Sequence, residues 1–408
     1  MPDWLDRATL RDPDRIAIER SGDRALTYGE LHAAAYAHAD ALCRDGVAPG
    51  DRVPIDDGDR LAFAAALHGT LIHGAAAVPI DPRLTAAEQE RRRRLGRASN
   101  TEVATIMHTS GTTSAPKPVE LTYGNWWANA SGSALALGLD VRERWLCVMP
   151  LAHVGGLAIL LRSAIYATTV IVHDTFDTDA VLAELMDARR AVTLVSLVPT
   201  MLVRLLDAGL QSPPTLRFVL LGGGPIPPGL AARAGSCGVP VAPTYGMTEA
   251  CSQIATFGLP LHGASLTLDR DGELLVRGPM VSAGALSADG WLHTGDLARF
   301  DAHGRLQIVG RRADTIVSGG ENVAPAEVEA VLLDHPGVAD AGVYAREDTE
   351  WGEAICAKVV LREPGVSGEE LRAFCTERLA RYKVPKEIAF TDALPRTVSG
   401  KLLRRELG

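Results

Sequence analysis

Apolar and polar positions alternate in two different ways along the chain, and the change between them divides it into regions. Between about residues 103 and 250, short β-rich apolar runs are separated by stretches with apolar residues at helical spacing. The strand-like runs are EVATIMH, WLCVMP, TVIVH, VTLVSLV, RFVLLG and VPVAPTYG, and the helical stretches include GLAILLRSAIYA and PTMLVRLLDAG. This alternation predicts an α/β fold with a largely parallel sheet covered by helices on both faces.

An earlier helical pattern carries its own start and stop signals. In LTYGELHAAAYAHADALCRDG, Thr27 and Glu30 have the spacing of a capping box, in which each side chain accepts a hydrogen bond from the other residue's backbone. Alanine-rich sequence follows, and Gly46 is the kind of residue that ends a helix. We therefore predict a helix between Thr27 and Gly46.

The pattern changes past residue 260, where glycine and aspartate punctuate short strands such as GELLVRGP and GRLQIVG. These runs predict an antiparallel β element. From Arg312 the chain reads as a small α+β unit with a helix opened by Pro325, a hairpin in AGVYAREDTEWGEAICAKVVLR, and a helix capped by Ser367 with Glu370. We expect a large N-terminal domain, residues 1–311, and a small mobile C-terminal domain, residues 312–408.

Composition narrows the class of protein. The 408 residues are 47% apolar and 22% charged, which is typical of a folded globular protein. The formal net charge of −9 argues against nucleic acid or an anionic membrane as the main partner, and the basic run Arg91 to Arg94 with Arg97 is interpreted as a solvated helix face.

Cysteine usage and hydropathy suggest a compartment. Six widely scattered cysteines form no CxxC pair, which favours a reducing environment, and no apolar run approaches the ~20 residues that cross a bilayer. No signal peptide pattern opens the chain. We expect a cytoplasmic protein without membrane insertion.

Residues 109–118, TSGTTSAPKP, are the first candidate for chemistry. A glycine flanked by hydroxyl residues can bring backbone N–H groups and hydroxyls onto one anion, and Lys117 adds a cation. The stretch does not fit GxxxxGK[ST], so it is not the usual nucleoside-triphosphatase loop. A Ser/Thr/Gly-rich stretch can also be simply a loop, and the rest of the chain has to decide.

Four later stretches favour a ligand site. LLGGGPIP places three glycines at the end of a strand, where ligands of open α/β sheets bind, and YGMTE combines an aromatic ring, a glycine, a hydroxyl and a carboxylate. HTGD offers an acidic group suited to ribose hydroxyls. GRRADTIVSGGENV begins the predicted small domain, and LPRTVSGK places Lys401 on a glycine turn near the C-terminus.

In this order, the motifs resemble those of the adenylate-forming superfamily, which includes acyl- and aryl-CoA ligases, luciferases and the adenylation domains of peptide synthetases. The resemblance extends from LTYGEL to GKLLRREL. Within the superfamily, YGNWWANASGSALALGL, LAHVGGLAILLRSAIY, VPTMLVRLL and TYGMTEACSQI are most similar to the o-succinylbenzoate–CoA ligases of menaquinone biosynthesis.

The resemblance implies a two-step reaction. A carboxylate attacks the α-phosphate of ATP to give an acyl-adenylate and pyrophosphate, and the thiol of coenzyme A then displaces AMP. Fixed donors and cations stabilise the charge that builds on the phosphate oxygens. ATP, Mg²⁺ and coenzyme A are the implied cofactor and substrates, together with a small-molecule carboxylic acid.

The resemblance also assigns roles on the nucleotide side. Glu249 should hold Mg²⁺, Thr248 should contact phosphate, and Lys401 should bridge the α-phosphate and the acid after closure of the small domain. The phosphate loop would comprise Thr109, Ser110, Gly111, Thr112, Thr113 and Lys117. The adenine and ribose would contact Gly222, Gly223, Gly224, Tyr245, Gly246, Asp296 and Arg311.

On the acid side, His153 is expected at the pocket entrance, with Gly155 and Gly156 making room for a flat ring. Arg162 either faces a second carboxylate or is a helix-surface arginine. Polar groups of the substrate would bind Ser252 and Gln253, and His108 is interpreted as structural. The thiol tunnel would be lined by Ser318, Gly319, Gly320 and Glu321.

The sequence departs from the family pattern at several positions. Ser114 and Pro118 stand where glycines are usual, which reduces backbone freedom and removes one N–H, and Ala313 stands at the expected hinge, residues 312–314, where many relatives have an acidic residue. The segment between AAVPIDPRL and EVATIMHTSGTT is shorter than expected.

These departures leave two alternatives open. One is an aryl-acid activator of another pathway, acting on coenzyme A or a carrier-protein thiol. The other is a non-catalytic homologue, against which the joint presence of Glu249, Asp296, Arg311 and Lys401 argues. The oligomeric state also stays open, a homo-oligomer included.

Overall fold

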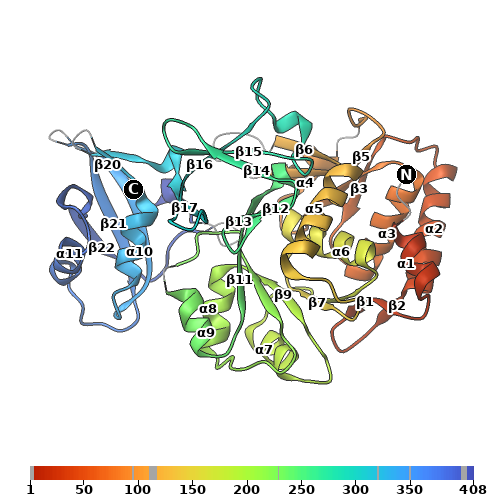
Figure 1. The fold of residues 1–408 in the computed structure, drawn as a ribbon, viewed down its shortest axis with the longest axis horizontal. Helices are drawn as coiled ribbons and strands as arrows, with labels where there is room; N and C mark the ends of the chain where they lie inside the picture. The colour runs from red at the N-terminus through yellow and green to blue at the C-terminus, as the bar shows by residue number, and fades with distance from the viewer. Residues whose placement is uncertain are drawn as a thin grey trace.

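The computed structural model describes residues 4–93, 96–109, 117–227, 229–318, 321–348, 351–396 and 402–408. Two sheets enclose a group of helices in the N-terminal part, a smaller antiparallel sheet follows, and a C-terminal α+β unit lies at one end (Figure 1). No helix in these ranges is long and apolar enough to span a membrane.

The largest sheet has nine strands in the order β13-β12-β11-β10-β9-β7-β8-β1-β2. The six strands from β11 to β1 pair in parallel, and the strands at the two ends pair antiparallel. This confirms the largely parallel sheet. Its strands are β1 (Ile16–Arg20), β2 (Ala25–Thr27), β7 (Arg144–Cys147), β8 (Thr169–Val172), β9 (Leu194–Leu197), β10 (Phe218–Leu221), β11 (Val241–Met247), β12 (Ser252–Thr256) and β13 (Leu259–Pro260).

Helices cover both faces of this sheet, as predicted. Neighbouring residues of β7 point to opposite cores: Trp145 and Cys147 belong to one apolar cluster, and Leu146 belongs to another. The first cluster includes residues of α1 (Trp4–Arg11), α2 (Tyr28–Arg44), α3 (Arg60–His73), α5 (Tyr123–Leu137) and α6 (Val154–Tyr166). The second includes residues of α7 (Thr178–Met186), α8 (Pro199–Asp207) and α9 (Leu230–Ser236).

A separate four-stranded sheet closes the other side of the first helix group. It has the order β3-β4-β5-β6, with β3 (Arg52–Asp56), β4 (Ala76–Ile80) and β5 (Val103–Thr109) parallel and β6 (Lys117–Thr122) antiparallel. The polar helix α4 (Ala86–Arg93) connects β4 toward β5 and buries none of its described side chains. The run EVATIMH is therefore a strand, as predicted, but it belongs to this second sheet.

Local signals position the helices as the sequence predicts. Thr27 Oγ1 accepts from Glu30 N at 3.2 Å, and Glu30 Oε2 accepts from Thr27 N at 2.8 Å, so the capping box of α2 is complete. The helix ends at Arg44, two residues before Gly46, whose φ is +76°.

An antiparallel sheet links the two parts of the chain. Its strands are β14 (Ser265–Leu268), β15 (Glu273–Arg277), β16 (Leu292–Phe300) and β17 (Leu306–Arg311), which confirms the predicted β element. After β11, the described residues include short 3₁₀ helices. They are η1 (Thr248–Ala250), η2 (Ala283–Ala285), η3 (Arg312–Asp314), η4 (Arg381–Lys383) and η5 (Arg404–Glu406).

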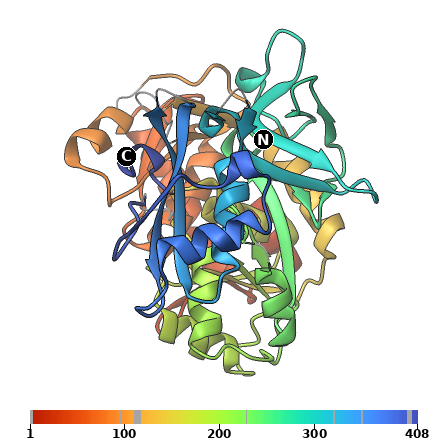
Figure 2. The same ribbon diagram turned by 90° about the vertical axis from the view of Figure 1, so that its left-hand side faces the viewer.

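The C-terminal unit, which faces the viewer in Figure 2, has its own sheet and core. The predicted hairpin is formed by β20 (Val338–Asp348) and β21 (Gly352–Leu361), beside β18 (Ile316–Ser318), β19 (Glu321–Val323) and β22 (Glu387–Phe390). The helices α10 (Pro325–Leu333) and α11 (Gly368–Thr376) pack on it, and Ser367 Oγ accepts from Glu370 N at 3.1 Å. The core of this unit begins at Ile316; the boundary after residue 311 stays a prediction.

Candidate active site

The nucleotide side of the predicted site is assembled from three strands. Tyr245 on β11 donates from Oη to Asp296 Oδ2 at 2.6 Å, and Arg311 Nε lies 2.7 Å from Asp296 Oδ1. Asp296 on β16 pairs with Arg311 on β17 in the strand register and is 4% exposed. Burial, together with the neighbouring Asp296 carboxylate, raises the pKa of Tyr245, so its hydroxyl remains a donor. The structure thus brings together three residues that are 66 positions apart at most (311 − 245).

Close packing or backbone conformation explains why glycines occupy positions on this side of the site. A Cβ on Gly222, at the end of β10, would lie 2.6 Å from Thr244 Cγ2, and Gly223 has a φ of +77°. A Cβ on Gly246 would lie 1.7 Å from Ser252 O, where β11 and β12 pair with an irregular register. Gly224 follows these residues in the same loop. These glycines let neighbouring strands approach closely, and their contacts with adenine stay a prediction.

Thr248 and Glu249 form the 3₁₀ turn η1 directly after β11. Both side chains are partly exposed, and the Glu249 carbonyl accepts from Ser282 N at 2.8 Å. Mg²⁺ commonly binds one or two carboxylates and completes its shell with water and substrate phosphates. A single partly exposed carboxylate therefore fits a Mg²⁺ ion that arrives with a nucleotide.

His153 is the N-cap residue of α6, and its side chain makes no capping hydrogen bond. It points instead to Arg83 and Asp81, two residues that the sequence did not single out. A Cβ on Gly156 would lie 2.3 Å from Pro150 O, so its missing side chain is required by the loop's own backbone, a different reason from the expected room for a ring. Gly155 has only Met149 Cε, at 3.9 Å, near its Cβ position.

Arg162 is buried inside α6, with 1% of its surface exposed, so the interpretation as a helix-surface arginine is wrong. Its Nη2 donates to Asn129 Oδ1, its Nε has no hydrogen-bond partner in the described part of the chain, and its guanidinium lies 5.8 Å from the ring centre of Trp145. No carboxylate among the described residues forms an ion pair with it. Burial lowers the pKa of Arg162, which expresses the cost of an uncompensated charge.

Asn129, on α5, is the residue that joins Arg162 to the rest of the site. Its Nδ2 donates to Gln253 O at 2.8 Å and to Ala250 O at 3.3 Å. Sequence analysis missed it, because a lone asparagine within a helix gives no signal of contacts more than 100 positions away. Arg162 thereby lies beside the turn that carries Glu249.

Ser252 and Gln253 begin β12. Ser252 has a φ of +95°, and Gln253 is buried, with Nε2 donating to Thr256 Oγ1 at 2.8 Å and Oε1 without a partner among the described residues. Their expected substrate contacts stay predictions.

The predicted phosphate loop connects β5 to β6. Thr109 and Lys117 pair in the strand register, as do His108 and Pro118, while Ser110, Gly111, Thr112, Thr113 and Ser114 lie outside the described residues. Burial, with smaller contributions from Arg92 and Arg52, lowers the pKa of His108 to about 4, so its ring is neutral near pH 7.

The C-terminal part of the predicted site is described only in part, since Gly319, Gly320 and Lys401 lie outside the described residues. Ser318 and Glu321 pair between β18 and β19, and Ser318 is buried. The expected hinge coincides with η3, where Arg312 donates to Glu273 at 2.9 Å and to Asp271 at 3.0 Å.

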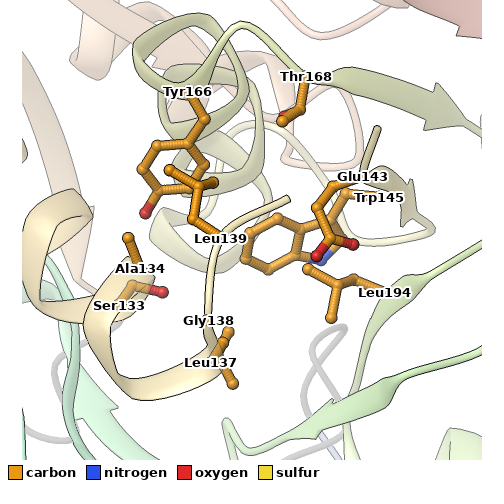
Figure 3. A pocket seen from close by; sticks show the side chains of 10 residues that line it. All are labelled: Ser133, Ala134, Leu137, Gly138, Leu139, Glu143, Trp145, Tyr166, Thr168 and Leu194. Atoms are coloured by element: carbon orange, nitrogen blue, oxygen red, sulfur yellow. The ribbon is translucent and has the colours of Figure 1, made fainter. Parts of the chain in front are cut away.

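A small pocket lies at the other end of α6 (Figure 3). It is lined by Ser133, Ala134, Leu137, Gly138, Leu139, Glu143, Trp145, Tyr166, Thr168 and Leu194. None of these is a predicted site residue.

Comparison with family models matches nearly the whole chain. A model described as AMP-binding enzyme matches residues 5–99 and 89–286, and one described as AMP-binding enzyme C-terminal domain matches residues 327–401. The two pieces of the first match overlap at residues 89–99, in and just after α4. This is the segment that the sequence predicted to be short.

Known relatives agree with these matches over their full length. A 2-succinylbenzoate–CoA ligase of Bacillus cereus is 37% identical over 475 aligned positions, which cover 100% of this chain and 98% of the relative. Since this chain has 408 residues, at least 67 positions (475 − 408) of the alignment have no counterpart in it.

Solved structures give the same result. The o-succinylbenzoate CoA synthetase of Bacillus subtilis in complex with its acyl-adenylate intermediate OSB-AMP has a TM-score of 0.89 and 36% identity, covering 100% of this chain and 98% of that chain. A double mutant of that synthetase bound with the product analogue OSB-NCoA, with the same identity and coverage, has a TM-score of 0.70. The relatives cover all the strands and turns that build the site, the family models cover those up to residue 286, and the chain belongs to the AMP-binding enzyme family.

Proposed function

We propose that the protein is an ATP-dependent acid–CoA ligase that acts on o-succinylbenzoate through an acyl-adenylate. The observation that carries this proposal is Arg162, a buried guanidinium without a carboxylate partner among the described residues, beside the turn that holds Glu249. A plain benzoate or fatty acid has one carboxylate, which the reaction consumes. o-Succinylbenzoate has a second, which can neutralise Arg162.

In the first step, a carboxylate oxygen of the acid attacks the α-phosphorus of ATP, and pyrophosphate leaves. Asp296 would hold the ribose hydroxyls, because its carboxylate is oriented by Tyr245 and Arg311. Thr248 would donate to phosphate, and Glu249 would hold Mg²⁺, which supplies positive charge to the phosphate oxygens. These groups are placed before the reaction, so they stabilise developing charge without reorganisation.

The acid would lie between α6 and β12. His153 would stand at the entrance, where 37% of its side chain is exposed, and Arg162 would face the carboxylate that does not react. The buried position of Arg162 makes this contact strong, because little water competes for the guanidinium. Gln253, whose Oε1 has no hydrogen-bond partner within the described ranges, would accept from a neutral polar group or a bound water.

In the second step, the thiol of coenzyme A attacks the acyl carbon, and AMP leaves with the former carboxylate oxygen. Lys401 would serve the first step and the segment from Ser318 to Glu321 the second, with the small domain turning about residues 312–314. The resemblance to the family supports these assignments, and we assign the product to menaquinone biosynthesis.

The test is acid-dependent ATP–pyrophosphate exchange with o-succinylbenzoate, plain benzoates and medium-chain fatty acids, followed by thioester formation with coenzyme A. Exchange specific to o-succinylbenzoate and lost in Lys401→Ala is the expected result. Better exchange with another aryl acid would assign the enzyme to a different pathway. Binding of ATP without exchange for any acid would contradict the proposal and indicate a homologue that no longer turns over.

A further inference from the structure

Three turns of the chain share one hydrogen-bonding pattern. In each, an aspartate is followed two positions later by an arginine that donates hydrogen bonds to its carboxylate. In each, the arginine donates from its backbone N and from Nε to Oδ1, and from Nη2 to Oδ2. The six side-chain distances lie between 2.7 and 3.1 Å. The three Asp-x-Arg turns are Asp81 with Arg83, Asp140 with Arg142, and Asp187 with Arg189.

Only one of these turns has a buried aspartate. The side chains of Arg142 and Arg189 are 84% and 90% exposed, and their aspartates are 41% and 30% exposed. Asp81 is 5% exposed and Arg83 is 36% exposed. The two exposed turns serve as a reference for what the pattern does by itself, which is to fix a surface loop. The Asp81–Arg83 turn has the same internal bonds, so the burial of Asp81 has another cause.

The burial follows from its place in the second sheet. Asp57 comes directly after β3 and Asp81 directly after β4, and the carboxyl ends of parallel strands lie along one edge of a sheet. Asp57 Oδ2 accepts from Leu151 N at 2.7 Å and from Ala152 N at 3.2 Å. The loop that leads to His153 is thus fastened to this edge, and it carries the imidazole to the Asp81–Arg83 turn.

Both partners of the turn contact one nitrogen of His153. Its Nε2 lies 3.2 Å from Arg83 Nη2 and 3.4 Å from Asp81 Oδ2. Burial alone would favour a neutral Asp81, but hydrogen bonds from Arg83 and His153 outweigh it and hold the pKa of that carboxyl well below its usual range. The turn therefore presents a fixed ion pair to the imidazole.

A fixed ion pair orients this ring in either protonation state. When Nε2 carries a lone pair, it accepts from the guanidinium of Arg83, and when Nε2 carries a proton, it donates to the carboxylate of Asp81. The position also lacks the usual capping role, since His153 is an N-cap residue whose side chain leaves the helix uncapped. The side chain of His153 therefore does not stabilise α6 by capping it.

We propose that Asp81 and Arg83 are positioning residues that hold the His153 imidazole at the entrance of the acid pocket. The proposal rests on the proposed function, because it takes the acid as the ligand that His153 meets. Loss of the turn would let the imidazole move away from the pocket entrance. Use of the acid would then be impaired, while binding of ATP would not.

The test compares Asp81→Asn with Asp140→Asn and Asp187→Asn, the same substitution in the two exposed turns. For Asp81→Asn we expect kcat/KM for the acid in ATP–pyrophosphate exchange to fall about 10-fold, with the KM for ATP within about 2-fold of wild type. The two reference variants should match wild type. Arg83→Lys, at a more exposed position, retains the charge but not the fork of donors, and it should show a smaller loss of the same kind.

The double variant His153→Ala/Asp81→Asn decides the mechanism. If Asp81 acts through His153, the double variant is no slower than His153→Ala alone. Independent, multiplying losses would overturn the proposal, as would an unchanged KM and kcat in both Asp81→Asn and Arg83→Lys. Wild-type protein that shows no exchange with any acid would instead refute the proposed function, so the two failures are distinguishable.

Discussion

The two sides of the candidate site differ in how their charges are balanced. On the nucleotide side, the Asp296 carboxylate bonds Tyr245 at 2.6 Å and Arg311 at 2.7 Å, so a negative charge is compensated within the protein. On the acid side, Arg162 is almost fully buried and contacts the neutral side chain of Asn129. The charge of Asp296 is therefore balanced without a ligand, whereas the positive charge of Arg162 has no carboxylate partner among the described residues.

The difference reflects what each side has to recognise. Ribose hydroxyls are neutral and bind well to a carboxylate that is already oriented, whereas a second carboxylate needs an opposite charge that nothing else has neutralised. Keeping such a charge buried costs stability. Under the proposed function, the acid side would lose stability in the free protein and gain selectivity toward a doubly charged acid.

Arg162→Met should have the largest effect. Removing the charge leaves the second carboxylate buried without a partner, so kcat/KM for o-succinylbenzoate should fall about 1,000-fold, or ~4 kcal/mol. Exchange kinetics across acids measure this. A plain benzoate serves as the control, because its activity should not fall; an equal loss for both acids would show that Arg162 is only structural.

Asp296→Asn should affect the nucleotide side alone. The amide retains the shape but loses the charge that faces Arg311 and the ribose, so the affinity for AMP should fall about 30-fold, or ~2 kcal/mol. Calorimetric titration with AMP measures it. The selectivity between o-succinylbenzoate and benzoate should remain that of wild type, and a changed selectivity would mean that the two sides are not separate.

The free protein should respond in opposite directions to the same two substitutions. Arg162→Met replaces an uncompensated buried charge by an apolar chain and should raise the free energy of unfolding by about 1 kcal/mol, while Asp296→Asn should lower it by about 1 kcal/mol. Thermal and urea unfolding without ligand measure both. If Arg162→Met is less stable than wild type, another group in the protein compensates the charge of Arg162.

Tyr245→Phe should give the smallest effect. It removes one hydrogen bond to Asp296 and leaves the ring, so the affinity for AMP should fall about 5-fold, or ~1 kcal/mol. The same titration measures it against Asp296→Asn. A loss as large as that of Asp296→Asn would indicate that the hydroxyl, and not Arg311, orients the carboxylate.

Parts of this site could be predicted from the sequence and parts could not. The motifs that contain Tyr245, Glu249 and Asp296 are recognisable as short ordered stretches, and the structure places Tyr245 and Asp296 in contact. The burial of Arg162 had a signal, since its helix is apolar on every side, as in LAILLRSAIY, and such a helix is usually buried. Asn129 and Asp81 gave none, because their partners lie on elements far away in sequence.

By itself, the sequence determined the local structure of this protein. The capping box of α2, the strands, the two-stranded hairpin and the order of motifs depend on residues within a few positions of one another, whose geometry is set by backbone sterics and short-range hydrogen bonds. The tertiary structure decided that β5 joins a second sheet, that Arg162 lacks a carboxylate partner among the described residues, and that one Asp-x-Arg turn meets His153 while its two counterparts face solvent. Those outcomes depend on which surfaces pack together, and packing couples residues by distance in space, which their separation along the chain does not reveal.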